Sequence, residues 1–240
     1  MNATRSACDA PTSVTAGSMS NTSSPSAIKR TSLLRRRAGL SVEAFRQHWA
    51  GPHAAIAVTM GGLAQYTQNR VVRTLWNHPV AGYACDGIVE LEFVDPQVMR
   101  QSASSAAVQT LLPADELRFM GAITLCRVPG GARQTHASRA KVMLAARLID
   151  AASTEASGRL GRLLADSGCL DWSIEAVQRV FHRDALEYEK EPPHAFASLW
   201  FEPTQDIEPV FTAVSQWSRA ALGVIERGSA WLCDPLAIVG

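Results

Sequence analysis

Residues 86–95 read DGIVELEFVD, and apolar and polar side chains alternate along this segment. A period of two is typical of a β-strand, because successive side chains point to opposite sides of a sheet. One face is apolar and is expected to pack under helices; it carries Gly87, Val89, Leu91 and Phe93. The opposite face carries Asp86, Ile88, Glu90 and Glu92.

A segment with the same division lies in the C-terminal half, where residues 194–201 read HAFASLWF. Its apolar face carries Ala195, Ala197, Leu199 and Phe201, and its mixed face carries His194, Phe196, Ser198 and Trp200. A solid core does not accept unpaired charge, because burying it is costly. The mixed faces therefore favour a ligand cavity between two sheets. The alternative is a partly solvated face with ordinary surface acids.

The elements around both segments follow one order, strand–helix–strand–strand–helix–strand, on either side of a break at Pro129-Gly130-Gly131. In the first half, strands are expected at residues 28–36, 63–72, 86–95 and 119–128. A helix that starts at Ser41 is interrupted at Gly51-Pro52, and a second helix covers 96–112. In the second half, strands are expected at 141–148, 172–181, 195–201 and 228–239, with helices at 154–166 and 206–222.

This order predicts an α+β protein built from two ferredoxin-like βαββαβ repeats. One repeat alone leaves a sheet face bare, so we expect two antiparallel sheets packed face to face as an α+β barrel within one chain. The expected domains are residues 27–130 and 138–240. A Ser-, Thr- and Pro-rich stretch at residues 1–26 is expected to be a disordered tail.

Composition narrows the class of protein. The 240 residues carry a net charge of +1, which argues against a nucleic-acid partner. No apolar stretch reaches the roughly 18–20 residues of a membrane span. Five widely spaced cysteines without a CxxC pair are typical of a reducing compartment and do not suggest a zinc site. Since no secretory signal is present, we expect a cytoplasmic protein with a small-molecule substrate.

Three motifs of the first half resemble the EthD family of the dimeric α+β barrel superfamily. They are LLRRRAGLSVEAFRQHWAGPHAAIA at residues 33–57, QYTQN at 65–69 and DGIVELEF at 86–93. The resemblance covers residues 28–128, and the second half lacks these motifs. It implies one site, built on the first half, with the second half as its built-in partner. Whether such pseudo-dimeric chains form a homo-oligomer stays open.

His53 is the first catalytic candidate, because Gly51-Pro52 holds it near a helix N-terminus, which disfavours its charged form. A neutral imidazole can act as a general base. His48 lies five residues earlier, which on a continuous α-helix turns the two side chains about 140° apart; the Gly-Pro break leaves open whether both face one pocket. Asp86 is expected to orient an imidazole or receive a proton, and Tyr66 to donate to a carbonyl or enolate oxygen. Capping, core packing or a strand-start turn is the structural alternative at these positions.

Five further residues are expected to bind the substrate: Trp49, Gln68, Glu90, His194 and Trp200. His194 occupies the position in the second half that corresponds to Asp86. The spacing of His48 and His53 is atypical for a metal pair and no third ligand is evident, so no metal ion is expected. The resemblance implies no organic cofactor either.

The resemblance implies a cofactor-independent isomerase or lyase that moves a proton on a small oxygenated ring compound, such as a lactone, an aromatic catabolite or a polyketide. The first alternative is a small-molecule-binding or accessory protein that uses the same cavity without turnover. The second is a structural pseudo-dimer whose barrel is filled.

Overall fold

The computed structural model describes residues 27–105, 107–130 and 138–240, so the expected tail at residues 1–26 lies outside it. The first half contains β1 (Ile28–Arg36), α1 (Val42–His48), a π-helical turn (Trp49–His53), α2 (Ala54–Ala57), β2 (Leu63–Asn77), β3 (Gly87–Phe93), α3 (Pro96–Ala103), a second π-helical turn (Ala107–Leu111), α4 (Leu112–Phe119) and β4 (Met120–Pro129). The second half contains β5 (Ala140–Leu148), α5 (Ala156–Ala165), β6 (Asp171–Ala176), β7 (Arg179–Phe181), β8 (Ala195–Phe201), α6 (Glu208–Phe211), α7 (Gln216–Ala221) and β9 (Ile225–Val239).

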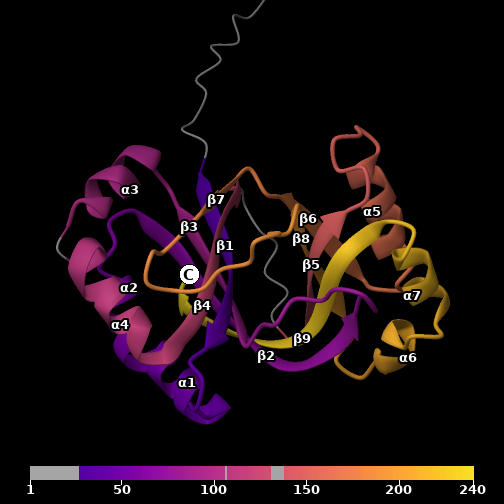
Figure 1. Cartoon of the computed structure of the whole chain (residues 1–240), viewed down its shortest axis with the longest axis horizontal. Helices are drawn as coiled ribbons and strands as arrows, with labels where there is room; N and C mark the ends of the chain where they lie inside the picture. The colour runs from indigo at the N-terminus through magenta and orange to yellow at the C-terminus, as the bar shows by residue number, and fades with distance from the viewer. Residues whose placement is uncertain (1–26, 106, 131–137) are drawn as a thin grey trace, which may run out of the picture.

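The strands form one antiparallel sheet in the order β6-β8-β5-β9-β2-β3-β1-β4-β7. The sequence predicts two sheets, but β2 and β9, each 15 residues long, pair with one another and join the two halves. This continuous sheet curls, so that Lys29 on β1 reaches Glu175 on β6 across the interior. Helices α1–α4 cover the outer face of one half and α5–α7 that of the other (Figure 1). The result is a mixed α+β fold with a curled antiparallel sheet.

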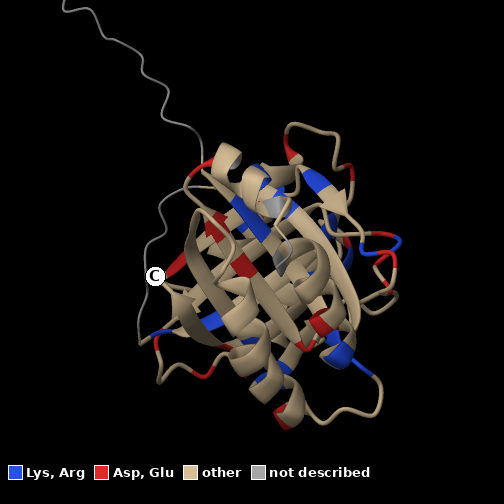
Figure 2. Ribbon diagram, turned by 90° about the vertical axis from the view of Figure 1, so that its left-hand side faces the viewer, with Lys and Arg blue, Asp and Glu red and all other residues tan. Residues whose placement is uncertain are grey.

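Apolar side chains from both halves pack together inside the curl. Ile88, Met143, Phe196 and Trp231 belong to one buried apolar cluster between the two halves. Beside it, the charged positions on the inner face pair with one another: Glu90 accepts hydrogen bonds from the ammonium groups of Lys29 at 2.8 Å and Lys141 at 2.7 Å. Acidic and basic positions therefore lie on strands near the centre of the molecule as well as on its loops (Figure 2).

The strand alternation places side chains as expected on β3. Val89 belongs to the apolar cluster under the first-half helices, and Ile88 belongs to the cluster inside the curl. The expected strand at residues 172–181 instead divides into β6, which pairs with β8, and β7, which pairs with β4 of the first half. The expected helix at 206–222 is two short helices, α6 and α7.

None of the helices in the described part of the chain is long and apolar enough to cross a membrane.

Candidate functional site

The π-helical turn between α1 and α2 brings His48 and His53 to one carboxylate. His48 Nε2 lies 2.9 Å from Asp115 Oδ1, and His53 Nδ1 lies 3.0 Å from Asp115 Oδ2. A π-helix closes its hydrogen bonds over five residues instead of four, so side chains five apart fall on the same face. The helical backbone continues through Gly51-Pro52, and its wider turn removes the angular separation that an α-helix would impose.

The shared carboxylate comes from α4, which occupies the stretch between the helix predicted at residues 96–112 and the strand predicted at 119–128. Pro113 lies in the first turn of α4, and Leu112, Asp115, Glu116 and Phe119 are its buried residues. Pro in the first turn and buried positions at spacings of three, four and seven are ordinary signals of a helix start and an inward face. These signals were available in the sequence, whereas the pairing of Asp115 with two histidines was not.

The surroundings of His53 favour its neutral form. Burial lowers the pKa of His53, and this effect outweighs the opposing one of the Asp115 carboxylate. Because the carboxylate accepts a hydrogen bond from Nδ1–H, the lone pair of the neutral ring lies on Nε2. The Phe119 ring packs against both imidazoles, with centroids 4.8 Å from His48 and 4.9 Å from His53. The geometry orients a single basic nitrogen.

His53 lines a narrow cleft between the sheet and the first-half helices, on the outer face of the sheet. Its volume is about 50 Å³, which is enough for a few water molecules and not for a ring compound. Trp49, Tyr66 and Ser32 line the same cleft. The Ser32 hydroxyl oxygen is buried there without a hydrogen-bond partner in the described residues.

Tyr66 and Gln68 lie close to this cleft as a hydrogen-bonded pair. The Gln68 side-chain amide donates to the Tyr66 hydroxyl at 2.7 Å and to the Trp49 carbonyl oxygen at 2.8 Å. Burial raises the pKa of Tyr66, so the hydroxyl keeps its proton. Because that oxygen accepts from Gln68, its own O–H remains available to donate to a ligand.

An ion pair between the two halves lies at the cleft. Arg183, in the loop after β7, approaches Glu116 of α4 with Nε 3.1 Å from Oε2, and both residues line the cleft. Burial raises the pKa of Glu116, while Arg183 acts in the opposite direction. Sequence reasoning missed both residues, because their proximity depends on β7 joining the first-half sheet.

The remaining predicted residues lie elsewhere. Asp86 accepts hydrogen bonds from the backbone and side chain of Arg36, at 2.9 Å and 3.0 Å, so the carboxylate beside the histidines is that of Asp115. Glu90 and Trp200 lie on the inner side of the curled sheet, where Lys141 contacts both. His194, which directly precedes β8, accepts a hydrogen bond from the backbone N–H of Leu148 at the end of β5. The structure therefore does not bring these residues to the cleft that His53 lines.

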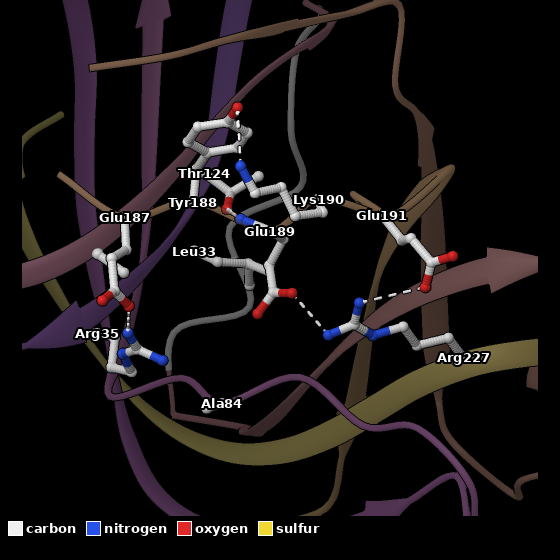
Figure 3. A pocket seen from close by; sticks show the side chains of 11 residues that line it. Leu33, Arg35, Ala84, Thr124, Glu187, Tyr188, Glu189, Lys190, Glu191 and Arg227 are labelled. Carbon is white, nitrogen blue, oxygen red and sulfur yellow. Dashed lines mark hydrogen bonds and ion pairs between the residues drawn. The ribbon is translucent and has the colours of Figure 1, made fainter. Parts of the chain in front are cut away.

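A second, larger cavity is lined by residues of both halves of the chain (Figure 3). It measures about 410 Å³ and is bordered by the segment 187–191, which runs beside β4. The charges that line it balance, since three basic and three acidic side chains border it. Arg35 pairs with Glu187, and Arg227 pairs with Glu189 and Glu191. Lys190 approaches the hydroxyl of Tyr188. His53 lines the first cleft and does not line this cavity.

Among the described residues, no group of three or more His, Cys, Asp and Glu side chains has an arrangement that could hold a metal ion.

Comparison with known proteins identifies the domain and the fold. The EthD domain family matches residues 37–122, which confirms the resemblance found in the sequence. No curated protein matches the chain. A crystal structure of an anthrone oxidase-like protein is similar with a TM-score of 0.59 and 11% identity, over 89% of this chain and 94% of that one.

Two further solved structures are similar. A candidate monooxygenase from Fusobacterium nucleatum has a TM-score of 0.50 and 7% identity over 87% of this chain and 93% of its own. An EthD family protein from Bacillus halodurans is 19% identical and aligns over 45% of this chain and 99% of its own, with a TM-score of 0.34. At these identities the first two likenesses show a shared fold.

Proposed function

Because residues 37–122 of this chain are an EthD domain, we propose that it is an enzyme that transfers a proton on a small oxygenated ring compound, with His53 as the general base. The observation that carries the proposal is the Asp115–His53 pair, whose orientation leaves Nε2 as the basic nitrogen of a residue that lines a cleft with Trp49 and Tyr66. A ring compound exceeds the 50 Å³ of this cleft, so the proposal requires the lining side chains to move apart when the substrate binds. A neutral base held by a buried carboxylate is a recurrent arrangement for proton transfer.

The chemistry is a deprotonation at carbon. Nε2 of His53 takes a proton from a C–H group next to a carbonyl, and the electron pair of that bond moves to the carbonyl oxygen. Tyr66 O–H donates to the resulting oxyanion, and Asp115 stabilises the imidazolium that forms. Return of the proton to a different carbon completes an isomerisation; loss of a leaving group completes a lyase reaction. No external oxidant or reductant is required for either outcome.

We also infer that the two halves are ferredoxin-like repeats, residues 27–130 and 138–240. The first half contributes β2-β3-β1-β4 and the second β6-β8-β5-β9, which are corresponding positions in the two strand–helix sequences. In the second half, the corresponding space between the sheet and its helices is filled by a buried apolar cluster that includes Phe201, Phe211 and Trp217. That packing supports a single site on the first half.

The test is exchange of carbon-bound hydrogen in deuterated water under nitrogen, followed by NMR. A β,γ-unsaturated lactone and anthrone serve as probes; anthrone is chosen because of the fold shared with the anthrone oxidase-like protein. The expected result is exchange that the unaltered protein accelerates and that His53→Gln slows by about 10²–10⁴-fold.

His78→Gln is the matched control, because His78 lies in the loop after β2 and its ring contacts Trp76 outside the cleft. Equal exchange by His53→Gln and the unaltered protein would remove His53 from the mechanism. Binding of the probes without accelerated exchange would favour the alternative, a binding protein that uses the same cleft.

A further inference from the structure

Arginine side chains gather on the outer face of the sheet at one end of the cleft. Arg30 on β1 lies directly opposite Arg127 on β4, which lies opposite Arg179 on β7. Arg183 follows β7, and it lines the cleft together with Arg30. These four residues are called the arginine cluster below. Directly opposed like charges destabilise a sheet, so the row is costly for folding alone.

The arginine cluster has few carboxylate partners. In the described ranges, Glu116 supplies the one carboxylate that lies within 4 Å of any of its four guanidinium groups. Arg30 contacts aromatic rings instead, with Phe93 and Phe181 each 5.8 Å from its guanidinium carbon. The Nε of Arg127 is buried without a hydrogen-bond partner. The cluster therefore carries an excess of positive charge and unused donors.

Three members of the arginine cluster lie close enough for their charges to interact. The pKa of Arg30 is lowered by burial and by the neighbouring charges of Arg183 and Arg127. The charge of Arg183 also helps lower the pKa of His53. The positive charge at this end of the cleft thus acts on the His53 imidazole. The unpartnered Ser32 hydroxyl lies two residues from Arg30 on the same face of β1.

We propose that the arginine cluster binds a carboxylate group of the ring substrate, so that the second half of the chain, through Arg179 and Arg183, supplies recognition to the site of the first half. Planar guanidinium groups match a carboxylate with paired hydrogen bonds. Glu116 pairs with Arg183 in this structure, and an incoming carboxylate replaces it. This inference rests on the proposed function for the identity of the site and adds the substrate class, an anionic ring compound.

The experiment measures binding of benzoate and of benzamide to the full chain by calorimetry. The two probes have nearly the same shape and differ in charge. We expect benzoate to bind about tenfold or more tightly than benzamide, and Arg183→Gln and Arg30→Gln each to weaken benzoate about tenfold. Arg118→Gln, which removes an exposed arginine from α4, is the matched control and should leave both affinities unchanged.

Three outcomes would overturn the proposal: equal affinity for the two probes, equal effects of the Arg183 and Arg118 variants, or no benzoate binding at tens of millimolar. Arg183→Lys keeps the positive charge and loses the planar guanidinium group, so it should bind benzoate with intermediate affinity. This variant replaces Arg183→Gln in the test if the Gln variant does not fold. His53→Gln separates this proposal from the proposed function, since it should slow exchange by about 10²–10⁴-fold while benzoate still binds.

Discussion

The carboxylate of Asp115 is the most informative single group to change, because it lies within hydrogen-bond distance of both imidazoles. Asp115→Asn keeps the shape and one acceptor oxygen but removes the charge. A hydrogen bond to a charged group contributes about 1.5–3 kcal/mol and a neutral one about 0.5–1.5 kcal/mol. The difference, about 1–2 kcal/mol, is the stabilisation that the His53 imidazolium loses.

That loss corresponds to roughly a tenfold reduction in proton uptake by His53, since about 1.4 kcal/mol is a factor of ten. We therefore expect Asp115→Asn to lower the pKa of His53 further and to slow hydrogen exchange about tenfold. Asp115→Ala removes orientation as well, and should slow exchange by about 10²-fold or more. Side-chain NMR titration of His53 and the exchange assay measure the two quantities.

Glu43→Gln is the control, because it also removes one negative charge, from an exposed position on α1 where Glu43 contacts Gln47. If Asp115→Asn and Glu43→Gln had the same effect on the titration of His53, the carboxylate would act only through the net charge of the protein. An unchanged exchange rate in both Asp115 variants would refute the assignment of His53 and Asp115 as a catalytic pair.

Three other predictions concern pH and stability. Burial lowers the pKa of His53 below its ordinary value of 6.5, so the unfolded chain binds a proton at higher pH than the native one. As the pH is lowered from about 7 to about 5, the free energy of unfolding measured in urea titrations should therefore fall, and it should fall less steeply in His53→Gln. Gly87→Ala places a Cβ 2.4 Å from Trp49 Cζ3 and should lower the free energy of unfolding by about 1–3 kcal/mol, whereas the Cβ of Gly51→Ala meets nothing within 4 Å. Equal thermal unfolding temperatures of the two variants would contradict this packing. Lys141→Met removes a buried ammonium that donates to a buried carboxylate at 2.7 Å and should lower the free energy of unfolding by about 3 kcal/mol without slowing hydrogen exchange; a smaller loss than that of an exposed lysine variant would argue against the buried pair.

The positions of most strands and the faces of β3 followed from local pattern. β1 and β8 have the predicted bounds, because a period of two depends only on neighbouring residues. The same pattern placed Glu90 on the inner face, but it did not show that Lys29 and Lys141 lie there as partners. Charge pairs between distant strands depend on register and curl, which no local window contains.

The site shows the same limit more sharply. Residues 33–57 carried much of the resemblance to the EthD family, which the match over residues 37–122 confirms. The imidazoles of His48 and His53 face one group because of the π-helical turn, whose wider backbone path brings side chains five residues apart to the same face. The residue types in this segment do not reveal that wider turn. Asp115 reaches the two histidines because of where α4 packs, and Arg183 reaches the cleft because β7 of one half pairs with β4 of the other. Local chemistry thus decides which residues form strands and helices, while long-range pairing decides which of them meet, since contacts over such sequence separations are made by packing and not by neighbouring residues.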